Sequence, residues 1–309
     1  MADKISTRQA YGDALVELGK KNKDIIVMDA DLSKSTMTAG FKKEFPERFF
    51  NAGIAECNMM GMASGLALSG KTVFASTFAM FAAGRAYEVI RNSIAYPKAN
   101  VKICATHAGI TVGEDGASHQ CIEDLALMRV IPGMTVVHPA DAVSTKKLLE
   151  QIAQENGPAY VRLGRLNIPV LYDEDAKIEL GKGSCVKDGS DVTVIACGLM
   201  VSEAVMAAEE LEKEGISVRV IDMHTIKPID EEIIVKAASE TKAVITAEEH
   251  SVIGGLGSAV AEVVVKKCPT KMAMVGVQDR FGQSGKPPLL MEEYNITAAD
   301  IVKTIKETL

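Results

Sequence analysis

The chain has 309 residues, of which 47% are hydrophobic and 24% charged, and its net charge at pH 7 is -7. This composition is that of a globular protein with about two domains of ordinary size. The acidic balance and the absence of a Lys/Arg cluster argue against nucleic acid as a partner, because phosphate binding needs a basic face.

The sequence also gives no sign of a membrane segment. The longest apolar window, around residues 59–70, is shorter than the roughly 20 residues that span a bilayer, and the start MADKISTRQAYGD lacks the apolar stretch of a signal peptide. The six cysteines are scattered, without a C-x-x-C pair or a Cys/His ligand spacing. We therefore expect a cytoplasmic protein with reduced thiols, no membrane contact and no metal ligands of its own.

Short apolar runs alternate with helical segments from one end of the chain to the other. In chain order, strands are predicted at 24–31, 72–76, 101–107, 134–140 and 159–164, and then at 191–198, 217–224, 243–250 and 271–277. Near-continuous apolar strands separated by helices indicate parallel sheets covered on both faces. The pattern predicts an α/β fold of two domains, each a mostly parallel sheet flanked by helices.

The boundary between the two sets of strands lies at residues 171–190. This segment carries five acids and three glycines and shows no helical period, which is typical of a linker. We expect a first domain at 1–170, a linker at 171–190 and a second domain at 191–309.

Polar residues cluster where the predicted strands end, which is where open α/β sheets bind ligands. In the first domain these are Asp29, Asp31, Ser76, Thr77, Thr106 and His107. In the second domain Glu248, Glu249 and His250 precede GGLGSAV (254–260), a glycine-rich turn entering a helix, which could hold a phosphate.

Four stretches of the first domain are candidates for chemistry: NAGIAECNMMGMASG (51–65), STFAMF (76–81), THAGITVGEDGASHQ (106–120) and RLGRLNIP (162–169). Each has a structural alternative. Glu56 could only complement a helix dipole, Phe78 and Phe81 could be core residues, the histidine-bearing loop could be an exposed connection, and Arg165 could be a solvated charge. Their joint occurrence at strand ends and helix starts favours one site.

The same stretches resemble a known family. The resemblance to the pyrimidine-binding domain of transketolases rests on NAGIAECNMMGMASGLALSG (51–70), STFAMF (76–81) and THAGITVGEDGASHQCIEDLALMRVIPGM (106–134). The resemblance to the C-terminal domain of that family rests on GLMVSEAVMAAEELEKEGISVRVIDMHTIKPID (198–230). Together they cover essentially the whole chain.

One part of a full-length transketolase has no counterpart in this sequence. The G-D-G…N motif that holds magnesium and the diphosphate of thiamine diphosphate in the family is absent, and Glu114-Asp115-Gly116 is not such a motif. The chain therefore resembles the C-terminal component of a split transketolase. The resemblance implies an N-terminal partner chain that binds the divalent ion, most simply in an α2β2 assembly.

For Glu56 the resemblance implies an activating role toward the cofactor. Thiamine diphosphate must lose a proton from its thiazolium carbon, and a carboxyl bonded to the aminopyrimidine ring favours the imino form that takes this proton. Such a carboxyl needs a dry setting, where burial raises a carboxyl pKa. The Met/Ala/Gly run that follows Glu56 predicts such a setting.

The remaining roles are carried over by position. His119 and His107 are the expected proton-transfer residues beside Glu56. The expected cofactor contacts are Phe78, Phe81, Asp31, Leu32 and Ile54. The expected sugar-phosphate contacts are Arg8, Ser35, His107, Asp115 and Arg165, with Arg162 as the alternative to Arg165.

The sequence also departs from the family pattern. Ala55 and Cys57 flank Glu56 where many relatives have arginine and histidine, and Gly84 replaces a common tyrosine. These changes leave acceptor choice and cofactor fit open.

The predicted reaction is transfer of a two-carbon ketol unit from a ketose phosphate to an aldose phosphate. Related thiamine enzymes, of the deoxyxylulose phosphate synthase or two-oxo-acid dehydrogenase type, are alternatives, and so is a non-catalytic regulatory subunit that kept the fold.

Overall fold

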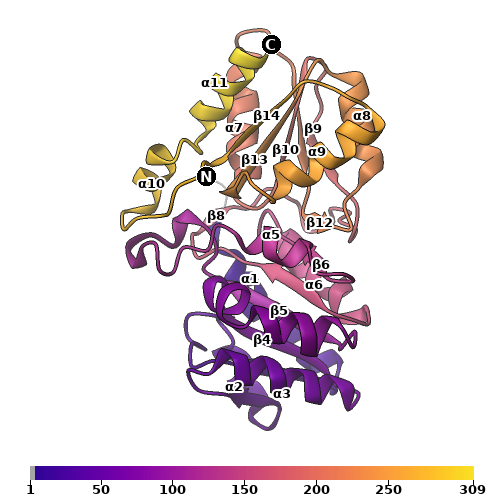
Figure 1. Ribbon diagram of the computed structural model, residues 1–309, viewed down its shortest axis with the longest axis vertical. Coiled ribbons are helices and arrows are strands. Elements are labelled where there is room, and N and C mark those ends of the chain that lie inside the picture. The colour runs from indigo at the N-terminus through magenta and orange to yellow at the C-terminus, as the bar shows by residue number, and fades with distance from the viewer. Residues whose placement is uncertain (1–3) are drawn as a thin grey trace.

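The computed structural model describes residues 4–309, which form two α/β lobes stacked along the long axis (Figure 1). In Figure 1 the first half of the chain, indigo to pink, makes the lower lobe, and the second half, orange to yellow, makes the upper one. Among these residues no helix combines the length and the apolar character needed to cross a bilayer.

The lower lobe is built on a seven-stranded sheet in the order β12-β6-β7-β5-β4-β2-β3. All pairings are parallel except that of β12 with β6. The strands are β2 (Ile25–Asp29), β3 (Phe49–Asn51), β4 (Thr72–Phe78), β5 (Val101–Thr106), β6 (Thr135–Val137), β7 (Ala159–Arg162) and β12 (Thr225–Lys227). A small antiparallel ribbon pairs β1 (Lys4–Ile5) with β8 (Ile168–Pro169).

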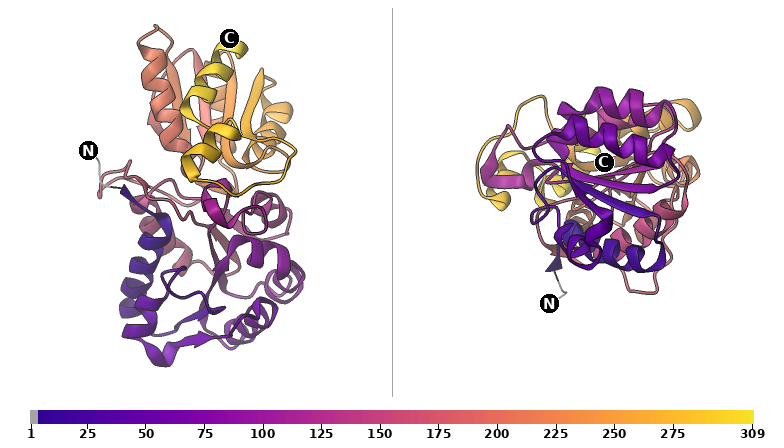
Figure 2. Two further views of the ribbon diagram at one scale, coloured as in Figure 1. Left: turned by 90° about the vertical axis from the view of Figure 1, so that its left-hand side faces the viewer. Right: turned by 90° about the horizontal axis from the view of Figure 1, so that it is seen from below.

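Helices cover both faces of this sheet, as the view from below in Figure 2 shows. Alternate residues of each central strand face opposite helical layers. Val27 and Phe74 pack in a cluster with Leu15 of α1 and Leu148 of α6. The neighbouring residues Met28 and Ala75 belong to another cluster, together with Met59, Met60 and Ala63 of α3. Because both faces are covered, the strands carry continuous apolar runs.

In the lower lobe α1, α3 and α6 are the long helices and the others are short. The α-helices there are α1 (Thr7–Lys21), α2 (Ala39–Glu44), α3 (Glu56–Leu68), α4 (Tyr87–Val89), α5 (Asp124–Arg129) and α6 (Ala142–Gln154). Two π-helical segments, η2 (Met80–Arg85) and η3 (Ile90–Ala95), flank α4, and two 3₁₀ segments are η1 (Pro46–Arg48) and η4 (Ile110–Asp115). Ser6 caps α1 and Asp141 caps α6, each accepting a backbone N–H.

The upper lobe is built on a five-stranded sheet in the order β14-β13-β10-β11-β9, parallel except for β9. Its strands are β9 (Ser184–Lys187), β10 (Val192–Ala196), β11 (Val218–Asp222), β13 (Val244–Ser251) and β14 (Met272–Val277). Its helices are α7 (Met200–Glu212), α8 (Glu231–Glu240), α9 (Leu256–Lys267), α10 (Pro287–Glu293) and α11 (Ala298–Thr308).

The fold class predicted from the sequence is confirmed, and all nine predicted strands are present. The structure adds short strands that the pattern did not indicate. One of them, β9, lies within the segment 171–190 that was expected to be a linker. Another, β12, follows β11 in the second half of the chain and joins the edge of the first sheet.

Candidate functional site

Glu56 is the first residue of helix α3, and its side chain is only 2% exposed. Arg85 Nη1 donates a hydrogen bond of 2.8 Å to Glu56 Oε2. The hydrogen bonds among residues 4–309 leave the other carboxylate oxygen without a donor. The acid that the sequence singled out is therefore buried and has one free acceptor.

Two phenyl rings lie beside this ion pair. Phe78 ends β4 and Phe81 belongs to η2, and their ring centroids are 5.9 Å apart with planes inclined by only 17°. The Arg85 guanidinium lies 4.8 Å from the Phe81 centroid. In η2 the Ala86 N–H bonds to Phe81 O, five residues back, and such π-turns are frequent at functional sites.

Two histidines complete the aromatic cluster. The His107 ring stacks on Phe78 with centroids 3.9 Å apart, and the His119 ring meets Phe81 edge-on at 5.3 Å. His107 has a φ of 57°, a left-handed conformation that a residue with a side chain adopts rarely. His107 directly follows β5, and His119 lies near the end of the loop that begins there. Both imidazole rings contact the phenyl rings from this loop.

Arg8 and Ser35 lie next to His107. Arg8 Nη1 donates to Ser35 O at 2.9 Å and lies 3.3 Å from His107 Nε2. The Arg8 Nε atom is buried and has no hydrogen-bond partner in the described part of the chain. The pKa of Arg8 is lowered by burial and by the nearby Arg165 cation, which places Arg165 within electrostatic reach.

His107 is a neutral imidazole in this setting. Burial lowers its pKa from 6.5 to about 3, and the positive charges of Arg8, Arg165 and His119 act in the same direction. The Thr106 hydroxyl lies 2.9 Å from His107 Nδ1 and fixes the ring. His107 can therefore donate or accept a hydrogen bond near neutral pH without carrying charge.

Asp31, Leu32 and Ile54 lie where the neighbouring strands β2 and β3 end. Asp31 has a φ of 66°, and it exchanges two hydrogen bonds with Asn51, of 3.0 and 2.9 Å. Leu32 N bonds to the buried Asp29 carboxylate, and Ile54 is 80% exposed. Asn51 and Asp29 thus shape the turn that carries these three residues.

The loop 107–120 carries Asp115 and approaches Arg165. Asp115 ends η4 and is exposed, whereas Arg165 is partly exposed and donates to Val112 O in the same loop. The competing Arg162 is fully buried. It donates to both Asp124 oxygens, at 3.1 and 2.9 Å, so it is not available to a ligand.

The acids at the end of β13 point to opposite sides. Glu248 accepts from Leu256 N and Gly257 N at 2.7 Å each, inside the GGLGSAV turn. The prediction that this turn could hold a phosphate is wrong, because the protein's own carboxylate caps the helix there. Glu249 instead accepts a hydrogen bond from Thr111 N of the first domain. Burial raises the pKa values of Glu248 and Glu249 to about 7 each. The positive charge of Arg162 lowers both pKa values, but by less than burial raises them.

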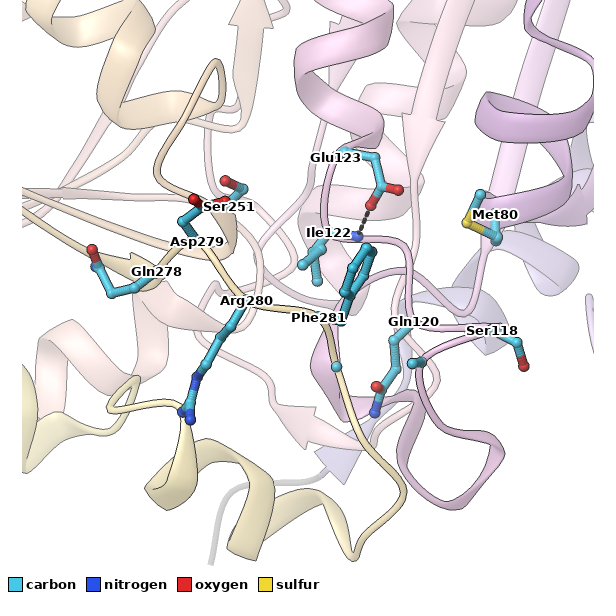
Figure 3. Close-up of a pocket in the computed structure, with 12 residues that line it drawn as sticks. Met80, Ser118, Gln120, Ile122, Glu123, Ser251, Gln278, Asp279, Arg280 and Phe281 are labelled. Atoms are coloured by element: carbon cyan, nitrogen blue, oxygen red, sulfur yellow. Dashed lines mark hydrogen bonds between the residues drawn. The ribbon is translucent and has the colours of Figure 1, made fainter.

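A pocket of about 460 Å³ opens beside the loop 107–120, between the two lobes (Figure 3). Met80, Ser118 and Gln120 line it from the first domain, and Gln278 to Gly282 line it from the second. Figure 3 shows Phe281 beside Ile122 and Glu123. The second domain therefore forms one wall of a cavity that adjoins the histidine loop.

Sequence reasoning missed two residues of this site, Arg85 and Glu249. Arg85 lies four residues after Phe81 in a helical segment, where an arginine gives no signal beyond that of a solvated charge. Glu249 was noted only as a polar strand end. Neither pairing can be derived from spacing in the sequence.

A two-domain α/β chain with a buried, arginine-paired acid and an adjoining cluster of two phenyl rings and two histidines defines a class of cofactor-assisted enzyme site, and comparisons with known proteins give its family. The family model for the transketolase pyrimidine binding domain matches residues 3–170, and that for the transketolase C-terminal domain matches residues 181–301. The chain belongs to the transketolase family and corresponds to its C-terminal part.

Relatives agree with this assignment. The chain is 55% identical over 303 residues, 97% of its length and 95% of the relative's, to a Methanocaldococcus jannaschii protein named "Putative transketolase C-terminal section". It is 39% identical to human transketolase over 310 residues, which are 99% of this chain and 49% of that protein. A solved structure titled as a split gene transketolase, inactive beta4 tetramer, has 57% identity and a TM-score of 0.93, covering 99% of this chain and 98% of that one.

Proposed function

We propose that this chain is the C-terminal subunit of a split, thiamine diphosphate-dependent transketolase. The complete enzyme would move a two-carbon ketol unit from a ketose phosphate to an aldose phosphate, breaking one carbon–carbon bond and forming another. The observation that carries the proposal is the buried Glu56 carboxylate, whose partner Arg85 lies over the ring of Phe81 in the cluster with Phe78 and His119.

The residues present fit the pyrimidine end of the cofactor. The Phe78 and Phe81 rings offer flat apolar faces, and Glu56 offers a buried acceptor. Asp31, Leu32 and Ile54 would contact the rest of the thiamine. When bound, thiamine diphosphate supplies a nucleophilic carbon that adds to carbonyl groups.

Within this chain, Glu56 would hydrogen-bond to the aminopyrimidine through the carboxylate oxygen that Arg85 leaves free. His119 would pass protons at the substrate oxygens, as its place at the edge of Phe81 allows. The neutral His107 would hold a substrate oxygen through a hydrogen bond rather than by charge.

Anionic sugars are the proposed substrate class. Arg8 and Arg165 provide two guanidinium groups near His107 and Ser35, and Asp115 would accept from a sugar hydroxyl. Among the relatives, one of Clostridium sp., 42% identical over 300 residues, is named "6-deoxy-6-sulfo-D-fructose transketolase subunit SqwH". Another, of Phocaeicola vulgatus, 39% identical over 304 residues, is named as a component of an apulose-4-phosphate transketolase. Both printed names agree with an anionic ketose as the donor.

The partner would be an N-terminal transketolase subunit that carries the diphosphate and Mg²⁺ site. This chain spans 49% of human transketolase, and residues 4–309 contain no cluster of three or more His, Cys, Asp or Glu side chains suited to a metal ion. An α2β2 assembly, the simplest closed arrangement of two kinds of subunit, is part of the same proposal, together with a cytoplasmic location.

Glu56→Gln in the complex of this chain with its N-terminal partner tests the proposal. Ketol transfer from a ketose phosphate should fall by about 100-fold or more, the size typical of a lost proton-transfer group. Glu88→Gln removes an exposed acid three residues after Arg85 and should leave the rate unchanged.

Full activity of the Glu56→Gln complex would remove Glu56 from the mechanism and would favour the regulatory-subunit alternative. Calorimetric titration with thiamine diphosphate and Mg²⁺ tests whether cofactor binding needs both subunits. Heat of binding is expected from the complex and not from this chain alone.

A further inference from the structure

The second domain reaches into the first through Glu249. The strand β13 carries two acids in succession, Glu248 and Glu249, near its end, and successive side chains of a strand point to opposite faces. Glu248 turns toward α9 of its own domain, whereas Glu249 turns toward the loop 107–120 of the first domain. Both side chains are buried, at 0% and 2% exposure.

The contact between Glu249 and the loop is close and polar. Thr111 N donates to Glu249 Oε1, and a Cβ added to Gly109 would lie only 2.4 Å from Glu249 Cδ. Gly109 has a φ of 84°, so glycine provides both the conformation and the space that the carboxylate fills. Arg162 Nη2 donates to Glu249 O at 2.9 Å and to Cys121 O at 3.2 Å, which ties the far end of the loop to the same residue.

Other atoms of the second domain close on the same loop. Gln120 Nε2 donates to Gln283 O and to Ile110 O, at 3.0 Å each. A Cβ added to Gly116 would lie 2.4 Å from Ser284 Oγ, and one added to Gly113 would lie 3.2 Å from Pro287 Cγ. The loop is therefore held between the two domains along its length.

We infer that Glu249 is a positioning residue for the substrate site: from the second domain it sets the path of the loop that carries His107, Asp115 and His119. Its effect on the loop follows from the contacts above. Its effect on catalysis rests on the proposed function.

Hydrogen exchange on the full chain, read by mass spectrometry, tests the positioning independently of activity. In Glu249→Ala the amides of residues 107–120 should exchange roughly tenfold faster or more, because the Thr111 N–H loses its buried acceptor. In Glu249→Gln the amide oxygen still accepts, so the acceleration should be smaller. Glu248→Gln, an equally buried neighbour whose carboxylate accepts its hydrogen bonds from α9 and makes none to the loop, should leave exchange in this loop unchanged. Equal exchange of the loop in Glu249→Ala and the wild type would overturn the inference.

Kinetics of the complex with the N-terminal partner test the consequence. Glu249→Ala should raise KM for the ketose phosphate roughly tenfold, with Glu249→Gln between it and the wild type. Glu248→Gln should lower the melting temperature and keep the wild-type KM. A fall in kcat at constant KM in Glu249→Ala would contradict positioning of the sugar-binding loop.

The two failures are distinguishable. If the complex shows no ketol transfer with any of these variants or with the wild type, the proposed function fails, and the exchange result stands on its own.

Discussion

At the scale of single residues, the site combines cations with a histidine that stays uncharged. Arg8 and Arg165 surround His107, and burial already disfavours its protonated form. A neutral imidazole beside two arginines suits the recognition of an oxyanion, because charge comes from the arginines and direction from the histidine. An incoming anion would screen both cations and bring His107 closer to its ordinary pKa.

Arg8→Ala should therefore raise the pKa of His107. In the wild type the value is about 3, lowered from 6.5 first by burial and then by Arg8 and Arg165. Arg8 lowers the pKa of His107 more than Arg165 does, but less than burial does. Without Arg8 the effect of burial remains, so the pKa of His107 should rise and still stay below 6.5. NMR titration of labelled imidazoles measures it.

The order of the variants checks this explanation. Arg165→Ala should produce a smaller rise, because Arg165 is the lesser cause. Arg48 packs against Phe45 elsewhere, so Arg48→Ala should produce none. The unfolded chain binds a proton near pH 6.5 and the folded chain does not, so His107 costs stability as the pH falls from 6.5 toward 3. An unchanged His107 pKa in Arg8→Ala would contradict the explanation that the Arg8 cation lowers this pKa.

Most of the site's residue types could be predicted from the sequence, but not the pairs between them. The structure brings Phe78, Phe81, His107 and His119 into one aromatic cluster, as strand-end placement suggested. Arg85, which pairs with Glu56, lies in the π-helix η2, and the wider turn of a π-helix is invisible to a 3.6-residue pattern. The choice between Arg162 and Arg165 depends on burial, which two nearby arginines in a sequence do not reveal.

At the scale of elements, the loop 107–120 follows a backbone path that left-handed residues define. Four of its residues, His107, Gly109, Gly113 and Gly116, have positive φ values of 57°, 84°, 87° and 74°. Three of the four are glycines, which adopt this conformation without strain.

Gly109→Ala should destabilise the chain more than Gly133→Ala. Both residues have positive φ, 84° and 73°, so alanine costs backbone strain of about 1 kcal/mol or more at each. At Gly109 the new Cβ also meets Glu249 at 2.4 Å, whereas at Gly133 it meets nothing within 4 Å. Urea unfolding should show a larger loss at Gly109 by at least about 1 kcal/mol. Equal losses would mean that Glu249 yields freely, in conflict with the positioning role.

Helix α3 offers a prediction of the opposite sign. Gly61 and Gly65 lie in its interior, and a Cβ added to either meets nothing within 4 Å. Because glycine in a helix costs about 0.5–1 kcal/mol relative to alanine, Gly61→Ala and Gly65→Ala should each stabilise the isolated chain by that amount. The matched contrast is Gly19→Ala in α1, where the Cβ would lie 2.5 Å from Phe41 and stability should fall. Thermal unfolding measures all three, and a loss at Gly61 would contradict an open helix face.

At the scale of the whole molecule, the two lobes are joined by a strand and by an apolar cluster, both of which combine residues from the two halves of the sequence. The strand β12 lies in the second half of the chain, yet it pairs with β6 at the edge of the first sheet. One apolar cluster contains Ile103 and Tyr160 of the first sheet as well as Ile195 and Ile221 of the second. The alternation of strands and helices was enough to predict two parallel sheets. The pairing of β12 with the sheet of the other lobe was not predictable. A strand of three residues shows no periodicity, and packing decides which strand it pairs with.

The buried Arg162 joins the lobes, and its removal should destabilise both together. From β7 it donates to Asp124 of α5 and to Glu249 O of β13, and both Arg162 and Asp124 are 0% exposed. Arg162→Ala leaves the Asp124 carboxylate buried without its cation, which costs about 3–5 kcal/mol in comparable cases.

The double variant Arg162→Met, Asp124→Leu removes both charges and should recover much of that loss. Lys21→Ala breaks an exposed pair with Glu150 and should stay within about 0.5 kcal/mol of the wild type. Urea unfolding of the full chain, followed by circular dichroism, provides the free energies. Because Arg162 bonds to both lobes, its loss should move one common transition. A loss below about 1 kcal/mol, or a shift confined to one lobe, would show that the arginine does not hold the two domains together.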